Sequence, residues 1–264
     1  MKKGILLVAF GTSVPQGRAA YETIDELARK QFDGTDLRWA YTSSFIRRKL
    51  ARQGEQYDSP LVALGRMREE GYTHVAVQSL HIAPGAEFHD LAATARQFRT
   101  GPNAFESIKL GSPLLSRERD VERVIAAVFE SLPDLGPKDA VVLMGHGNEH
   151  GDGELSLVAA AAKFKLANPL AFFGTAEGQP SAEDVLEQCR RHEPERAFLV
   201  PFLTVAGDHA RNDLAGDEPD SWKSQISDLG IECVPVLKGL GENKDVVAIW
   251  MDHLQAAFDA LENE

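Results

Sequence analysis

Three side chains that suit metal binding follow apolar stretches of the chain. His146 closely follows the run 140–144, which holds only apolar residues with two adjacent valines and is typical of a buried strand. His209 follows a second, mostly apolar stretch, 197–206, and Glu177 follows a shorter third one. Because ligands of open α/β sheets bind at the carboxyl ends of the strands, we expect these side chains to face one cavity.

Imidazole and carboxylate ligands together suit a borderline divalent cation such as Co²⁺, Ni²⁺, Fe²⁺ or Zn²⁺. Three protein ligands leave coordination positions for a substrate, as a catalytic or delivery site requires. We therefore interpret His146, Glu177 and His209 as a metal site. The glycines at 145 and 147 are expected to turn the chain sharply beside His146. For each histidine, a hydrogen-bonded structural role is the alternative.

The order of the expected elements predicts an α/β protein. Strands are expected at 4–10, 37–41, 73–80 and 107–110, and again at 140–144, 170–173, 196–203 and 231–237. Helical patterns separate most of them, which predicts parallel sheets with right-handed crossovers. We predict two similar lobes, 1–135 and 136–264, each a four-stranded parallel sheet flanked by helices, with an active-site cleft between them. No element is assigned between 210 and 230.

The two halves also resemble each other in sequence, which indicates an internal duplication. Aligning Gly85 with Gly207 places Glu87 on His209, so Glu87 of the first half is expected at the same cleft. His89, two residues later on the same predicted helix, is expected at the surface or at a subunit contact. The remaining expectation concerns four histidines at element ends, in loops or on polar faces, which are expected to have no functional role: His74, His150, His192 and His253.

Hydroxyl side chains close two strands of the first half. Thr12 and Ser13 follow the first strand, and Thr42 and Ser43 follow the second. They are candidates to bind carboxylates of a substrate, aided by the helix N-terminus that follows. Ordinary helix capping is the alternative, and Ser44 is the expected cap of the second helix.

Composition limits the classes of function. The chain has 264 residues, 43% hydrophobic content and a net charge of -12, which fit a soluble globular protein and argue against nucleic-acid binding. No stretch approaches the ~20 apolar residues of a membrane helix. Cys189 and Cys233 form no CxxC pair and are expected to be free thiols. We expect a cytoplasmic protein; a leader removed earlier is the alternative.

Several motifs resemble those of one enzyme family. They lie at 6–13 (LLVAFGTS), 78–82 (QSLHI), 144–147 (MGHG), 205–213 (VAGDHARND), 220–223 (DSWK) and 239–243 (GLGEN). On these residues the chain is identified as a member of the anaerobic sirohydrochlorin cobaltochelatases, which are class II chelatases like ferrochelatase. The resemblance implies the two-lobed chelatase fold and ATP-independent insertion of Co²⁺ into sirohydrochlorin during anaerobic cobalamin biosynthesis.

The resemblance also implies roles for individual residues. The metal-site histidines of the family match His146 and His209, its second-half glutamate matches Glu177, and its first-half acidic residue matches Glu87. His146 and Glu87 are then the candidates that accept the pyrrole protons. Some relatives bind haem between subunits through a histidine in the region of His89, so haem is retained as an alternative.

Three other functions agree with the same residues. The same ligands accept Fe²⁺, so a ferrochelatase acting on sirohydrochlorin or another porphyrin is the nearest alternative. A tetrapyrrole- or metal-binding protein without turnover is a second, and a two-lobed solute-binding module is a third. A homo-oligomer is the expected alternative to a single chain.

Overall fold

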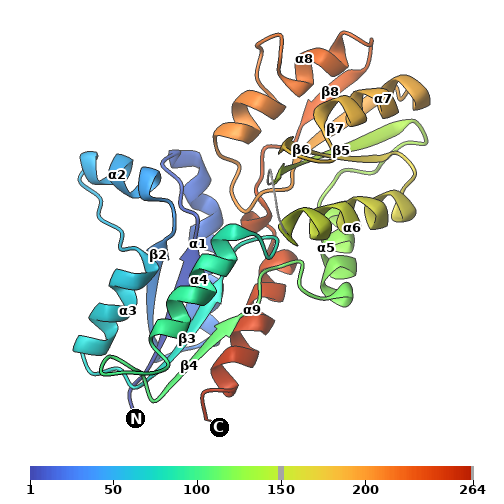
Figure 1. Ribbon diagram of the computed structural model, residues 1–264. Helices are drawn as coiled ribbons and strands as arrows, with labels where there is room; N and C mark the ends of the chain where they lie inside the picture. The colour runs from blue at the N-terminus through green and yellow to red at the C-terminus, as the bar shows by residue number, and fades with distance from the viewer. Residues whose placement is uncertain (148–151, 263–264) are drawn as a thin grey trace. The chain divides into compact units, whose positions relative to one another are not determined.

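The computed structural model describes residues 1–147 and 152–262 and contains two α/β units (Figure 1). Each unit is built around a parallel sheet of four strands. Helices flank both sheets, so the fold class predicted from the sequence is confirmed. His150 lies outside the described residues.

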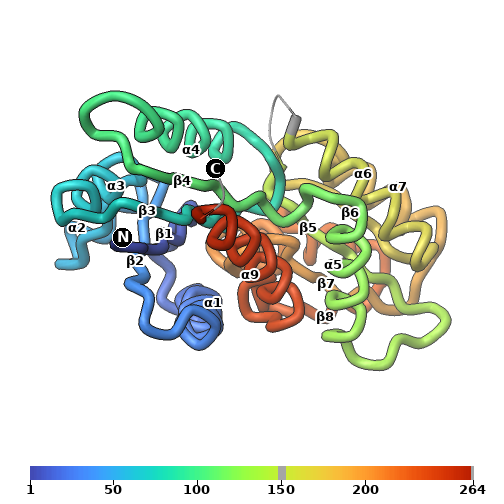
Figure 2. Tube along the Cα trace, turned by 90° about the horizontal axis from the view of Figure 1, so that it is seen from below, coloured from blue at the N-terminus to red at the C-terminus, as the bar shows by residue number. Residues whose placement is uncertain are grey.

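The sheet of the first unit has the strand order β2-β1-β3-β4. Its strands are β1 (Lys3–Ala9), β2 (Asp36–Tyr41), β3 (His74–Ser79) and β4 (Ser107–Gly111). Its helices are α1 (Arg18–Gln31, preceded by the short η1, Pro15–Gly17), α2 (Ser44–Arg52), α3 (Pro60–Glu69), α4 (Ala86–Gln97) and α9 (Lys244–Asp259). Figure 2 shows α3 and α4 on one face of this sheet and α1 and α9 on the other.

Burial of both faces explains the continuous apolar run in β1. Ile5, Leu6, Leu7 and Val8 are all fully buried, as expected for a central strand of a parallel sheet covered by helices on both sides. Leu6 and Val8 belong to the core formed with α3 and α4. The alternate residues face the opposite side of the sheet, because successive side chains of a strand point in opposite directions.

Local signals set the ends of the helices in this unit. Ser59 caps α3 by accepting a hydrogen bond from the Val62 amide at 3.3 Å, with Pro60 at the first helical position. At α2 the cap is Ser43, whose hydroxyl accepts from the Ile46 amide at 3.3 Å. The prediction that Ser44 caps this helix is therefore wrong by one residue.

The sheet of the second unit has the strand order β6-β5-β7-β8. Counted from the first strand of each unit, this is the same order as in the first sheet. Its strands are β5 (Asp139–Gly147), β6 (Ala171–Glu177), β7 (Arg196–Pro201) and β8 (Glu232–Pro235). Its helices are α5 (Glu118–Glu130), α6 (Asp152–Ala167), α7 (Ala182–His192) and α8 (Trp222–Ser227), with the short η2 (His209–Leu214) and η3 (Leu240–Glu242).

Aromatic and aliphatic side chains hold helices on both faces of this second sheet. Val185 of α7 and Trp222 of α8 pack in one core cluster with Val142 of β5. On the other face, the Phe164 ring of α6 lies 5.6 Å from that of Phe202, measured between ring centroids. The strand order reverses between β5 and β7, and ligands of such sheets bind where it reverses, at the carboxyl ends of the strands.

The boundary between the units differs from the predicted one at residue 136. Residues from Arg117 to Val246 group with the second sheet, together with the segment Val14–Tyr21, whereas the chain from Val247 onward groups with the first. Two hydrogen bonds join α9 to this unit: Trp250 donates to the His81 carbonyl at 3.4 Å, and His253 Nδ1 lies 3.0 Å from the Ser112 carbonyl. The predicted division at one point of the sequence did not include this, because the C-terminal segment packs on the first sheet.

Two short helices occupy the interval in which the sequence predicted no element. The first, η2, is a π-helix that begins at His209. The second, α8, is capped by Ser221, whose hydroxyl accepts from the Ser224 amide at 3.1 Å. No helix of the described residues is both long and apolar enough to span a membrane. Cys189 and Cys233 are free thiols, as predicted.

Candidate metal centre

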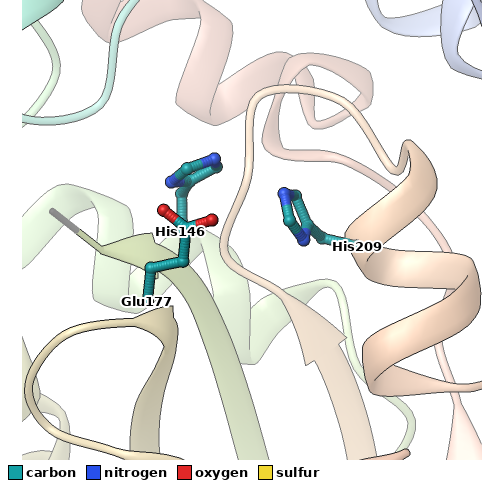
Figure 3. A group of neighbouring side chains, drawn as sticks. All are labelled: His146, Glu177 and His209. Atoms are coloured by element: carbon teal, nitrogen blue, oxygen red, sulfur yellow. The ribbon is translucent and has the colours of Figure 1, made fainter. Parts of the chain in front are cut away.

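His146, Glu177 and His209 lie together in the second unit (Figure 3). Each offers one ligand atom, and these atoms all lie within 4.8 Å of one another. His146 comes from the end of β5, Glu177 from the end of β6, and His209 from the start of η2, after β7. The structure thus brings together the three residues that the sequence placed in one site.

A glycine beside His146 allows the close approach of β5 and β6. Gly147 pairs with Glu177 in the sheet and has a φ angle of +85°, which favours glycine. A Cβ atom at this position would lie 1.5 Å from the Glu177 carbonyl oxygen. Gly145 instead pairs with Thr175 inside a regular stretch of β5, so the prediction that both glycines turn the chain is wrong for Gly145.

A backbone contact orients the His146 ring. Its Nδ1 lies 3.1 Å from the Gly147 carbonyl oxygen, which can only accept a hydrogen bond. The proton of the neutral ring is therefore expected on Nδ1, which leaves the Nε2 lone pair for a cation. The rings of His146 and His209 meet edge to face, with an interplanar angle of 82°.

The carboxylate of Asp213 contacts Nδ1 of His209. Nδ1 of His209 lies 2.5 Å from Oδ2 of Asp213, four residues later in η2. His146 and Glu177 are exposed and His209 is half-buried, so water and a dissolved cation can reach the group. Two imidazoles and one carboxylate in this arrangement can hold a borderline divalent cation while leaving further coordination positions open.

Glu87 lies in the first unit, at the second position of α4. A carboxylate in the first turn of a helix interacts favourably with the helix dipole, which is a structural role. Burial lowers the pKa of Arg47, and the charge of Glu87 acts in the opposite direction, so these two side chains are electrostatic neighbours. The catalytic role of Glu87 stays a prediction.

The candidate substrate-binding hydroxyls also belong to the first unit. Thr12, Ser13 and Ser43 are buried, and Ser43 is occupied as the cap of α2, as the capping alternative predicted. The Thr42 hydroxyl oxygen is buried, with no hydrogen-bond partner among the described residues. Substrate binding by these four residues stays a prediction.

His89 is exposed on α4, with its ring 5.8 Å from that of Phe88. Haem binding through this residue stays a prediction. Sequence reasoning missed Asp213, although the spacing of four residues from His209 was visible. The two side chains meet because the segment forms a helix. That helix was not predicted, because the segment after His209 has no regular apolar pattern.

The chain has two similar parallel α/β units, and one of them carries a His–Glu–His group at its strand ends. These features are those of a metal-binding α/β protein. A comparison with protein families gives a more specific result: the model of the family "Cobalt chelatase (CbiK)" matches residues 3–259. The chain belongs to this cobalt chelatase family.

Individual relatives agree with the family. The chain is 43% identical to the sirohydrochlorin cobaltochelatase CbiKC of Nitratidesulfovibrio vulgaris strain Hildenborough, over 99% of this chain and 93% of the relative. It is 36% identical to the sirohydrochlorin cobaltochelatase of Salmonella typhimurium strain LT2, over 100% of this chain and 99% of the relative.

The fold has solved counterparts. A crystal structure of the sirohydrochlorin chelatase SirB from Bacillus subtilis subspecies spizizenii, in complex with cobalt, superimposes with a TM-score of 0.62. That comparison covers 100% of this chain and 98% of the other, at 16% sequence identity. At this identity the similarity concerns the fold alone.

Proposed function

We propose that this chain is a sirohydrochlorin cobaltochelatase, which inserts Co²⁺ into the macrocycle of sirohydrochlorin without ATP. The observation that carries the proposal is the His146–Glu177–His209 group at the carboxyl edge of a parallel sheet. The names of the two curated relatives, which align with nearly the whole chain, support the choice of substrate. The absence of a phosphate-binding loop motif from the sequence agrees with a reaction that needs no nucleotide.

Insertion of a metal ion requires that the ion lose water and that two pyrrole N–H protons leave the ring. Nε2 of His146, Nε2 of His209 and the Glu177 carboxylate would hold the incoming Co²⁺, which is a substrate of the reaction. Three protein ligands leave positions at which pyrrole nitrogens replace water. The negative charge of Glu177 offsets part of the charge of the cation before the ring takes it.

The pyrrole protons need an acceptor as the metal enters. His146 and Glu87 are the proposed acceptors, because imidazole and carboxylate are effective general bases. His146 cannot use Nε2 for the cation and for a proton at the same time. Its two roles would therefore be sequential: it releases the cation to the macrocycle first and then takes a proton.

The ligand set does not by itself select cobalt, because Fe²⁺ accepts the same donors. The test is an anaerobic absorbance assay in which the protein is mixed with sirohydrochlorin and either Co²⁺ or Fe²⁺, against a protein-free reaction. We expect faster metallation with Co²⁺, and loss of this acceleration in His146→Ala. His192→Ala, which removes an exposed imidazole at the end of α7, is the matched control and should keep full activity.

Each outcome of this assay has a clear meaning. Acceleration with Fe²⁺ alone would contradict the proposed cobaltochelatase activity and indicate a ferrochelatase. Retention of the ring and the ion without their combination would indicate a binding protein. Full activity in His146→Ala would contradict the proposed metal site.

A further inference from the structure

Asp213 contacts the proposed metal ligand His209. None of the roles expected from the sequence was assigned to Asp213. Both residues belong to the π-helix η2, at positions i and i+4, where side chains of a helix are neighbours. The distance between Nδ1 and Oδ2 is 2.5 Å, which is short even for a charge-assisted hydrogen bond. In Figure 3 the His209 ring points toward His146.

The chemistry of the acceptor determines which nitrogen of His209 carries the proton. An ionised carboxylate can only accept, so Nδ1 of the neutral imidazole must be the donor and Nε2 must hold the lone pair. His146 has the same arrangement with the Gly147 carbonyl at 3.1 Å. The two rings therefore use the same tautomer, but only His209 has a charged acceptor.

We propose that Asp213 is a positioning residue for cation delivery, which holds His209 in the Nδ1–H tautomer and aims its Nε2 at the ion. The proposal rests on the proposed function of the His–Glu–His group. A carboxylate behind a ligating histidine fixes the orientation of the ring and increases its basicity as a ligand. Asp213 would thus affect the affinity for the ion without touching it.

A purely structural role of Asp213, stabilisation of η2, would instead lower the free energy of unfolding when its charge is removed. The side chains of His209 and Asp213 are 36% and 50% exposed, and exposed ion pairs contribute little to stability because water screens them. Because this pair is exposed, we expect that removing the charge of Asp213 hardly changes the free energy of unfolding. A tautomeric role predicts that the imidazole itself changes state.

The variant Asp213→Asn separates the two roles. The side-chain amide of asparagine can donate a hydrogen bond, so it can pair with an unprotonated Nδ1 and favour the Nε2–H tautomer, which has no lone pair for the ion. Asp208→Asn is the matched control, since it removes the same charge one residue from His209. Among the described residues, the Asp208 side chain makes no capping hydrogen bond with the backbone of η2.

The first measurement is the ¹⁵N spectrum of the imidazoles in the metal-free protein. We expect the Nδ1–H tautomer for His209 in the wild type and in Asp208→Asn, and a shift toward Nε2–H in Asp213→Asn. The second is an anaerobic Co²⁺ titration, in which Asp213→Asn should bind the ion at least tenfold more weakly, at the lower end of the range typical for such contacts. KM for Co²⁺ should rise more than kcat falls.

Two results would overturn the positioning role: an unchanged His209 tautomer in Asp213→Asn, or equal loss of Co²⁺ affinity in both variants. Asp213→Glu provides a further check, because it keeps an acceptor-only side chain and should restore the wild-type tautomer. These readouts do not depend on turnover. If the wild type fails to metallate sirohydrochlorin, the proposed function fails while the spectra and the titration still test Asp213.

Discussion

The imidazole rings of His146 and His209 lie 4.8 Å apart, measured between their centroids, and meet at 82°. They reach this position from β5 and from the segment after β7, the two strands between which the order of the sheet reverses. The loops after such strands separate at the sheet edge and leave space for a ligand. The pair therefore owes its position to the topology, and Glu177 from the neighbouring β6 adds the negative charge.

That charge can be tested by Glu177→Gln, which keeps the size and one carbonyl oxygen of the side chain. We expect at least a tenfold loss of Co²⁺ affinity, because a neutral amide is a poorer ligand for a divalent cation than a carboxylate. Unfolding should be nearly unchanged, since Glu177 is exposed. The measurements are an anaerobic Co²⁺ titration and urea unfolding.

Glu187→Gln is the matched control for this prediction. Glu187 is exposed on α7 of the same unit and is not part of the metal group. Wild-type affinity in Glu187→Gln would show that the loss comes from the site and not from net charge. Wild-type affinity in Glu177→Gln would remove Glu177 from the proposed ligands.

Gly147→Ala should damage the site through the backbone. The φ angle of +85° disfavours any residue with a Cβ, and that atom would collide with the Glu177 carbonyl oxygen, 1.5 Å away. Strain of the left-handed conformation alone costs roughly 1–2 kcal/mol. The collision adds to it and must displace the end of β6, so both the free energy of unfolding and the metallation rate should fall.

Gly54→Ala separates the two effects. Gly54 has a similar φ of +88°, but a Cβ there would meet no described atom within 4 Å. This control should lose only the ~1–2 kcal/mol of conformational strain and keep full activity. Equal losses of stability in both variants, with activity retained, would mean that the chain relaxes around the methyl group added at position 147 without disturbing Glu177.

Glu87→Gln tests the predicted proton acceptor of the first unit. If Glu87 takes a pyrrole proton, the variant should lose roughly 10²-fold or more in kcat and keep the Co²⁺ affinity of the wild type. Asp90→Asn, an exposed carboxylate on the same helix, is the control and should keep its activity. A variant Glu87→Gln with unchanged kcat would leave proton transfer to His146 or to water.

The regular parts of the fold could be predicted because their residues follow simple patterns. The buried run in β1 and the proline after Ser59 each predict a local structure that does not depend on distant contacts. The proposed metal site followed from the same logic, since His146, Glu177 and His209 all come near strand ends. The sequence located these ends to within a few residues.

The parts that the sequence missed depend on contacts between distant segments. Trp250 and His253 of α9 are hydrogen-bonded to residues more than a hundred positions earlier. The collision that requires glycine at position 147 arises only when β5 pairs with β6. The contact of Asp213 with His209 exists only because η2 forms. Local propensity contains none of this information.

His81 provides a prediction about stability and pH. Its Nδ1 lies 2.9 Å from the Ser79 hydroxyl, while its Nε2 is buried without a hydrogen-bond partner among the described residues. Burial lowers the pKa of His81 from 6.5 to about 4, because the charged imidazole would lose its hydration. In the unfolded chain the imidazole has its ordinary pKa of about 6.5.

The sign of the effect follows from proton uptake. Above pH 6.5 the imidazole is neutral in both states, and its full contribution to stability is present. Between pH 6.5 and about 4 the unfolded chain binds a proton that the folded protein does not, so the free energy of unfolding falls as the pH is lowered. One pKa unit corresponds to about 1.4 kcal/mol, so this loss amounts to up to about 3 kcal/mol.

Urea unfolding at pH 7.5 and pH 4.5 measures the loss in the wild type and in His81→Gln. The variant cannot titrate at this position, so its stability should fall less between the two pH values, even if it is less stable at both. His192→Gln removes an exposed histidine and should keep the wild-type dependence on pH. The same loss in the wild type and in His81→Gln would show that His81 takes up its proton equally in the folded and unfolded states.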